Sequence, residues 1–184
     1  MSQKKSVLSE NLKLAKIVLI ACVILTLVVI APMKLNGKRN KALDVFMNGT
    51  YDKHRASVYT DLKNIAENAN RLVRACEKED SADKENVEKL KEAAVRISGT
   101  NEAHEMLNAF KGISYYADSA YESLSESGKE NCNDAYVNLT RFLAVVKNDS
   151  YFSLADEFNR TRNAFPTSLM AGIFGIDELP TGGN

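Results

Sequence analysis

Tryptophan is absent from this chain, and proline and glycine are scarce, with 3 and 9 copies among 184 residues. So few turn-forming residues leave little room for the many tight turns of an all-β fold. A long run that alternates Val, Ile or Thr with polar residues is also missing, so strands are hard to place. These absences favour an all-α fold, and the length suits one domain with a hydrophobic core plus appendages.

The formal net charge is zero, but the charges are unevenly distributed along the sequence. Residues 1–42 carry eight Lys and Arg side chains against Glu10 alone, which leaves 16 of the 24 basic and 23 of the 24 acidic side chains for the rest. Nucleic-acid binding needs a basic face, so we expect no nucleic-acid partner for the acidic part. The basic end flanks an apolar segment, where anionic lipid headgroups would lie.

Side chains that could support catalysis or bind a metal are few. The two histidines, His54 and His104, are distant in sequence, and the Glu-x-x-His pair of a helical di-iron site does not occur. The sequence also lacks a G-x-S-x-G turn and a glycine-rich phosphate loop. We therefore expect no enzyme, no cofactor and no metal site, with both histidines at or near the surface.

The three cysteines have different settings. Cys22 lies in the apolar N-terminal segment and is expected to be a small packing or lipid-facing residue. Cys76 and Cys132 both fall on predicted core faces, so they are either two buried thiols or one disulfide. The disulfide applies only outside the reducing cytosol, and the sequence does not fix the separation of the two Cα atoms.

An uncharged stretch of 15 residues, Ile17–Ala31, predicts a membrane anchor. It would span roughly 22 Å as a helix, whereas residues 14–35 would span roughly 33 Å and match a hydrocarbon core of about 30 Å. Lys16 and Lys34 then lie near the ends, where their ammonium groups reach the headgroups. A cleaved signal peptide is the competing interpretation, but the best cleavage position, after Ala31, is followed by Pro32, which disfavours it.

The orientation of this anchor is not decided by the positive-inside rule, because four Lys and Arg side chains precede the segment and four follow closely. A short leader before an apolar segment favours an N-terminus inside the cell. We therefore expect a single-pass protein of the cell membrane whose C-terminal domain is extracytoplasmic.

Turn signals divide the rest of the chain. We expect a basic leader at 1–13, the anchor at 14–35, a linker at 36–50 that begins where Asn36-Gly37 ends the anchor helix, a bundle at 51–176 and a flexible tail at 177–184. Apolar stripes predict helices over about 51–77, 82–98, 101–124 and from 130 onward, with Thr50, Asp80, Ser81 and Thr100 as capping candidates. Together they predict an antiparallel up-and-down bundle of about four helices.

The stripe of the first bundle helix is the clearest. It consists of Val58, Leu62, Ile65, Ala69, Leu72 and Cys76. Its expected solvent face consists of Asp61, Lys63, Glu67, Arg71 and Arg74. The final stripe, by contrast, slips phase between Val146 and Tyr151, so the last helix either breaks near Asp149 or rotates its buried face.

The segment Ser168–Ile176 is more apolar than a closing loop needs to be. Two interpretations remain: its side chains fold back over one end of the bundle, or it contacts a membrane or a partner. The first is favoured because large exposed apolar patches are uncommon. It concerns Leu169, Ile173, Phe174 and Ile176.

The stretch Tyr151–Ile176 resembles the end of the LemA family of bacterial membrane proteins. That family carries a Tyr-Asn pair, a second one seven residues on, Phe-Pro after seven more, and an Ala…Phe-Gly-Phe ending. The corresponding residues are Tyr151, Phe158, Asn159, Phe165, Pro166, Ala171, Phe174 and Gly175. Phe152, Phe158 and Ile176 depart from the pattern, and so does Asp61-Leu62…Asn70–Val73, which lacks the proline of the family's upstream segment.

This resemblance implies a divergent member of the family: an anchored antiparallel bundle with one continuous final helix through Asp149, and no catalytic residue. Combined with the missing catalytic groups, it leads us to expect a non-enzymatic scaffold or adaptor of the bacterial envelope. Its partners would be the bilayer, through residues 14–35, and another envelope protein or a second copy of the chain. The alternative is an extracytoplasmic helical bundle that senses a small molecule between its helices.

Overall fold

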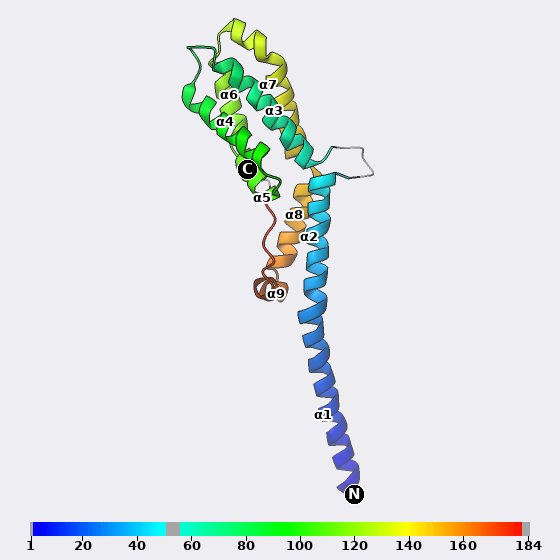
Figure 1. Cartoon of the computed structure of the whole chain (residues 1–184). Helices are drawn as coiled ribbons and strands as arrows, with labels where there is room; N and C mark the ends of the chain where they lie inside the picture. The colour runs from blue at the N-terminus through cyan, green and yellow to red at the C-terminus, as the bar shows by residue number, and fades with distance from the viewer. Residues whose placement is uncertain (1, 51–55, 182–184) are drawn as a thin grey trace. The chain divides into compact units, whose positions relative to one another are not determined.

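The structure is a computed structural model that describes residues 2–50 and 56–181, and this part of the chain is helical without strands (Figure 1). The all-α prediction is thereby confirmed. The elements are α1 (Ser2–Leu25), η1 (Thr26–Ile30), α2 (Ala31–Asn48), α3 (Val58–Cys76), α4 (Lys84–Gly99), α5 (Ala103–Phe110), α6 (Ile113–Glu122), α7 (Glu126–Lys147), α8 (Ser150–Asn163) and α9 (Thr167–Ile173).

Two compact units make up the chain. The first, the anchor unit, contains residues 1–40 and 157–178, and the second, the bundle unit, contains residues 41–156 and 179–184. Residues 157–176 thus group with the anchor rather than with the domain predicted for 51–176. The physical reason is that α9 packs against η1 and that Lys38 on α2 pairs with Glu157 on α8.

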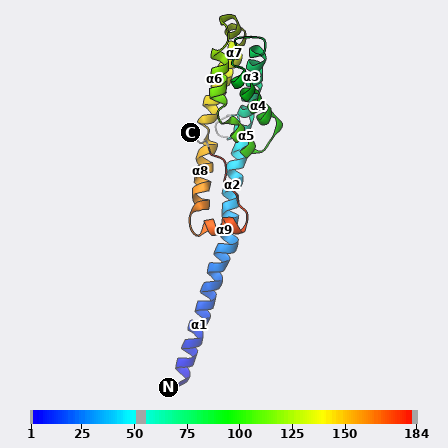
Figure 2. The same ribbon diagram turned by 90° about the vertical axis from the view of Figure 1, so that its left-hand side faces the viewer.

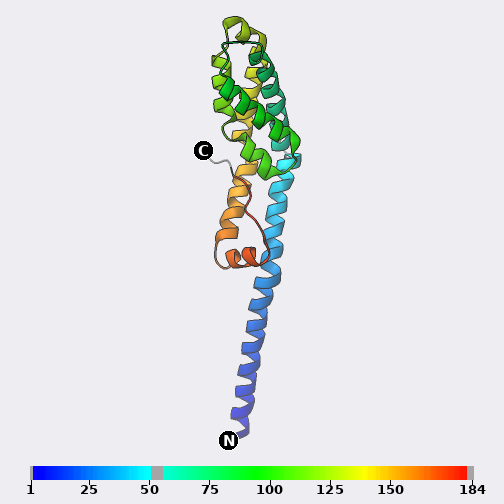
Figure 3. The ribbon, with the colours of Figure 1, turned by 60° about the vertical axis from the view of Figure 1, so that its left-hand side comes forward.

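The bundle unit is built on four helices, α3, α4, α6 and α7, which run antiparallel in up-and-down order (Figures 1 and 3). Helix α3 packs mainly against α7 and α4, and the short α5 packs against α4. The predicted bundle is therefore confirmed.

Helix α3 shows why the pattern succeeds. All six residues of its predicted stripe are buried. Asp61, however, was expected on the solvent face and is only 3% exposed. The reason is positional: Asp61 lies three residues after Val58 and four before Ile65, so it shares the buried face of the helix.

The first residues of the helices differ from prediction by a few positions. Ser57 is the N-cap of α3, where its Oγ accepts a hydrogen bond of 3.1 Å from the backbone N–H of Thr60. Thr50 therefore does not cap this helix, and residues 51–55 lie outside the described part. Helix α4 is likewise capped by Asp83 rather than by Asp80 or Ser81, through the N–H of Asn86 at 3.2 Å.

The helix predicted over 101–124 is two helices. Gly112 has a φ of +82°, a left-handed conformation that favours glycine, and it separates α5 from α6. Thr100 does not cap α5 from the N-cap position, which Glu102 occupies, although its Oγ1 accepts from the N–H of Glu102. The buried stripe nevertheless continues through both helices, because Met106, Ile113 and Ala117 are all fully buried.

The last helical stretch breaks after Lys147. Helix α7 begins at Glu126, with Ser125 as its N-cap, and ends one residue before Asn148. The Asp149 carboxylate then accepts a hydrogen bond of 2.7 Å from the N–H of Tyr151 and starts α8. The continuous final helix implied by the LemA resemblance is therefore wrong, and the phase slip of the apolar stripe reflects a real break.

Helix α2 continues through Asn36 and Gly37 and ends at Asn48, so the predicted helix end and linker at 36–50 are wrong. Leu35, Ala42, Val45 and Phe46 are buried along α2, and this packing outweighs the turn preference of Asn-Gly. The predicted interruption at Asn48-Gly49 is confirmed, because Gly49 has a φ of +75° and its N–H returns to the carbonyl of Val45.

Candidate functional site

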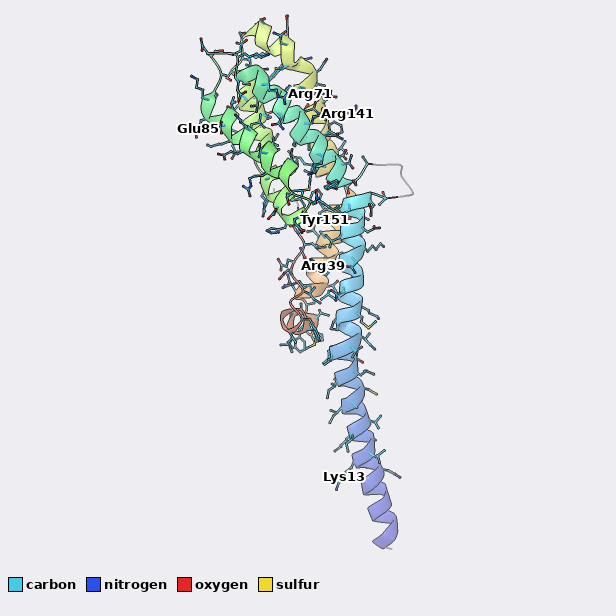
Figure 4. All side chains as sticks on the ribbon, viewed as in Figure 1. Lys13, Arg39, Arg71, Glu85, Arg141 and Tyr151 are labelled. Carbon is cyan, nitrogen blue, oxygen red and sulfur yellow. The ribbon has the colours of Figure 1, made fainter. Side chains whose placement is uncertain are left out.

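The most unusual surface of this protein is the exposed apolar side of its N-terminal helix. The stretch Asn11–Asn48 is the one described helix long and apolar enough to cross a membrane, and none of its most apolar 18 residues is buried. Every side chain from Asn11 to Ile30 is exposed except that of Leu27, which is half-buried. From about Lys13 onward, side chains project on all sides of the N-terminal helix, as Figure 4 shows. A helix that is apolar all round requires an apolar environment.

A π-helical turn, η1, lies at the C-terminal end of this apolar run. Pro32 has no N–H, and in a regular α-helix its ring would clash with the carbonyl of Val28. In the structure the N–H of Ala31 bonds to the carbonyl of Thr26, five residues back, which widens the turn before the proline. The Thr26 hydroxyl also donates a hydrogen bond of 2.9 Å to the carbonyl of Cys22, so its polar group is satisfied within the helix.

Polar contacts follow directly after the apolar run in the anchor unit. Lys38 Nζ lies 2.8 Å from Glu157 Oε1 and 3.3 Å from Thr161 Oγ1, so α2 and α8 are joined at this level. Arg162 Nε donates a hydrogen bond of 2.7 Å to the carbonyl of Ile176, and Asn163 Nδ2 donates one of 2.7 Å to Glu178 Oε1. These bonds hold both ends of the segment that contains α9.

The residues of the LemA-like signature separate into two groups. Tyr151, Phe158 and Ala171 are buried, which agrees with a structural role for those positions. Phe165 and Phe174 are exposed, and Gly175 has a φ of +60° at the end of α9. The remaining two, Asn159 and Pro166, are half-buried.

The closing apolar segment does not fold back as expected. Ile176 is buried, but Leu169, Ile173 and Phe174 are 57%, 65% and 47% exposed. The prediction that these three side chains cover the bundle is therefore wrong. A seven-residue helix can bury only one side, and in α9 that side is formed by Met170 and Ala171.

Cys76 and Cys132 are both buried and both free thiols in the structure. Burial raises the pKa of the Cys76 thiol to about 12, with a further contribution from the neighbouring Cys132. Burial also raises the pKa of Cys132. The two cysteines are thus neighbours on α3 and α7, which are packed together, and their oxidation to a disulfide stays a prediction.

An open groove of about 610 Å³ lies between α3 and α7 in the bundle unit. Its basic side chains are Arg71, Arg74 and Lys78, and its acidic ones are Glu79 and Asp134. Glu79 accepts a hydrogen bond of 3.1 Å from the Ser125 hydroxyl, and Arg71 is paired at 2.7 Å with Glu67, which does not line the groove. The lining itself carries three cations against two carboxylates and is therefore net basic. Such a groove suits a small anionic molecule.

The described part of the chain contains no cluster of side chains that could bind a metal ion. His104 is exposed, as expected, and His54 lies outside the described residues. Within residues 2–50 and 56–181, no three His, Cys, Asp or Glu side chains lie close enough together to hold a metal ion.

Comparisons with protein-family models, with curated proteins and with solved structures find no match to this chain.

Proposed function

We propose that this protein is a non-enzymatic scaffold or adaptor that is anchored in a membrane through residues 14–35. One observation supports it most strongly: exposed apolar side chains surround the stretch 17–30, where Leu27 alone is half-buried, in a helix long enough to cross a bilayer. In water, burying such side chains would be favourable by about 25 cal/mol for each Å² of apolar surface, so a lipid environment stabilises this arrangement.

In this proposal the bundle unit carries the surface that binds the partner. The chain would be a divergent LemA-like protein, and its bundle unit would lie on the extracytoplasmic side of a bacterial cell membrane. Its partner is another envelope protein or a second copy of the chain. The residues that support the family resemblance are the buried positions Tyr151, Phe158 and Ala171, which fix the structure around α8 and α9.

Anchoring is tested by fractionation of cells that express the full-length chain. We expect the protein in the membrane pellet, resistant to carbonate and released by detergent. The triple variant Ile20→Arg, Ile24→Arg and Val28→Arg should move to the supernatant. The control is the double variant Val95→Arg and Val137→Arg, which introduces positive charges at exposed valines of α4 and α7. This control should stay in the pellet. A wild-type chain that remains soluble without detergent contradicts the anchor.

The side of the membrane and the scaffold role need separate measurements. Alkaline phosphatase fused after Asn184 should be active, because it folds only outside the cytoplasm. In detergent, the tagged full-length chain should form an oligomer by light scattering or retain a defined envelope protein through washing. A chain that is strictly monomeric and recovers no protein speaks against the scaffold.

The groove between α3 and α7 favours a second candidate, the sensing of a small anionic molecule. Its lining carries three cations against two carboxylates, and the size of about 610 Å³ suits a metabolite. In this case phosphate esters or dicarboxylates should raise the melting temperature of the detergent-solubilised chain. The shift should fall in Arg74→Ala and persist in Arg141→Ala, whose side chain is exposed outside the groove.

A further inference from the structure

The segment from Ala164 to Ile176 carries no charged side chain, yet much of it is exposed. Phe165 is 86% exposed, and the outward side of α9 and its C-cap adds Leu169, Ile173 and Phe174. Charged residues bound the segment on both sides, with Arg162 before it and Asp177 and Glu178 after it. An exposed apolar surface with a polar rim requires an apolar partner.

The position of α9 identifies that partner. Within the anchor unit α9 contacts η1, which ends one residue before the end of the apolar run Ile17–Ala31. Figures 2 and 3 both show α9 lying crosswise beside the long N-terminal helix. If η1 is surrounded by lipid, α9 is at the same depth, because the two are in contact. The exposed side chains of α9 and of η1 then lie in the same layer of the bilayer.

The backbone around α9 is suited to that environment. A non-helical segment near lipid must satisfy its own polar groups, because water is scarce there. Before α9, the Thr167 hydroxyl donates to the carbonyls of Thr161 and Ala164, and the N–H of Ser168 also bonds to Ala164. After it, the N–H of Ile176 returns to the carbonyl of Ala171, and the carbonyl of Ile176 accepts from Arg162.

The charged groups next to this segment fit a headgroup layer. Lys34 and Arg39 follow the apolar run on α2, and Arg160 lies in the last turn of α8, while Lys38 and Arg162 are paired with Glu157 and Glu178. Cations placed one or two turns beyond an apolar surface reach anionic phosphates while their stems remain on lipid. Both chain segments of the anchor unit thus change from apolar to basic near the same level.

We propose that residues 164–176 are a second membrane element: α9 lies in the boundary between acyl chains and headgroups, in the leaflet that surrounds η1. The occupant of its exposed apolar surface is the lipid bilayer rather than a protein. This inference rests on the proposed membrane anchor, and it adds that the protein contacts the bilayer twice, once across it and once along its surface.

The absence of tryptophan makes a direct test available, because each introduced tryptophan is the only one in the chain. Leu169→Trp and Phe174→Trp probe α9 independently, Ile24→Trp probes the middle of the anchor, and Tyr115→Trp probes an exposed position on α6. Each full-length variant is reconstituted in vesicles of phosphatidylcholine and phosphatidylglycerol with or without brominated acyl chains. Circular dichroism checks that each variant keeps its helical content.

We expect both α9 variants to emit at shorter wavelength than Tyr115→Trp and to lose most of their fluorescence to bromines near the headgroup. Ile24→Trp should be quenched most by bromines deep in the acyl chains, and Tyr115→Trp by neither. If Ile24→Trp is quenched and the α9 variants are not, the second contact is wrong while the anchor stands. If no variant is quenched, the anchor itself fails. Blue-shifted α9 emission without quenching, in a chain that cross-links to itself, means that a second copy covers α9 and overturns the lipid assignment.

Discussion

The hydroxyl group of Tyr151, at the start of α8, donates a hydrogen bond of 2.9 Å to the backbone carbonyl of Pro180. Tyr151 is fully buried and packs edge-on against Phe46, with ring centroids 5.1 Å apart. Leu179, next to Pro180, is also buried. Part of the tail that was predicted to be flexible from residue 177 is therefore packed into the bundle unit, while residues 182–184 lie outside the described part.

Replacement of Tyr151 by phenylalanine should destabilise the bundle unit. The ring packing would remain, but the half-buried Pro180 carbonyl would lose its donor, which costs about 1 kcal/mol. The measurement is urea unfolding of the full-length chain in detergent, followed by circular dichroism. Tyr115→Phe is the control, because Tyr115 is exposed and its hydroxyl should contribute little. Equal unfolding midpoints for the two variants would contradict the role of the bond to Pro180.

Alanine substitutions at two glycines, one at the break between α5 and α6 and one elsewhere, test whether this break requires glycine. Gly112 has a φ of +82°, and a Cβ at this position would lie 3.1 Å from the Tyr116 ring, so Gly112→Ala should destabilise by about 1 to 2 kcal/mol. Gly99 is the last residue of α4, and a Cβ at this position would meet no neighbouring atom within 4 Å. Gly99→Ala should therefore be neutral or stabilise by up to about 1 kcal/mol. Both are measured by thermal unfolding, and a more stable Gly112→Ala would show that the break does not depend on glycine.

The stripes of single helices could be predicted from the sequence. In α3 and α7 the buried positions follow the spacing of apolar residues, since both helices bury one face in the bundle. Even there, the stripe that the spacing predicts for α7, Cys132, Ala135, Leu139, Phe142 and Val146, is wrong at one position, because Leu143 is buried and Phe142 is half-buried. A one-residue error of this kind arises because adjacent apolar residues in a helix both lie near the edge of the stripe.

The positions at which helices break or continue were harder to predict than the residues that each helix buries. Asn36-Gly37 favours a turn locally, but packing of Leu35 and Ala42 keeps α2 helical through it. Pro32 signals a disturbed helix before it, but the residue alone does not specify a π-turn such as η1 rather than a kink or a helix end. The exposure of α9 could not be predicted, because an apolar segment has the same composition whether protein or lipid covers it.

The Cys76 thiol should be alkylated much more slowly than the thiol of an exposed cysteine. Burial raises the pKa of Cys76 to about 12, and only the thiolate reacts with iodoacetamide, so Cys76 should resist alkylation at pH 8 until urea unfolds the chain. The experiment uses a variant in which Cys22 and Cys132 are serine. In its control, Cys76 is also serine and Val137→Cys supplies an exposed thiol on α7. Rapid native alkylation of Cys76 would contradict its burial.

The disulfide prediction needs the wild-type chain. If Cys76 and Cys132 are bridged in an oxidising compartment, mass spectrometry of the unfolded, unreduced chain should show a mass lower by two hydrogens than after reduction. Their separate burial on packed helices places the thiols close enough to influence each other. An unchanged mass in protein collected from outside the cytoplasm would exclude the bridge.

Asp61 should make the bundle unit more stable as the pH falls. Burial raises the pKa of this carboxyl above its ordinary 3.8, and the negative charge of Asp149 raises it further. An acid with a raised pKa binds its proton more tightly in the folded state, so its stabilising contribution is complete below pH 3.8 and is lost as the pH rises through the folded pKa.

The comparison of Asp61→Asn with the wild type isolates this contribution from the other carboxyl groups. Asp83, for example, acts in the opposite direction, because hydrogen bonds from Asn86 lower its pKa. We expect the free energy of unfolding of Asp61→Asn, relative to wild type, to be greater at pH 7 than at about pH 4. Asp156→Asn, at an exposed position on α8, is the control. A pH-independent difference for Asp61→Asn would mean that Asp61 has the same proton affinity in the folded and unfolded chains.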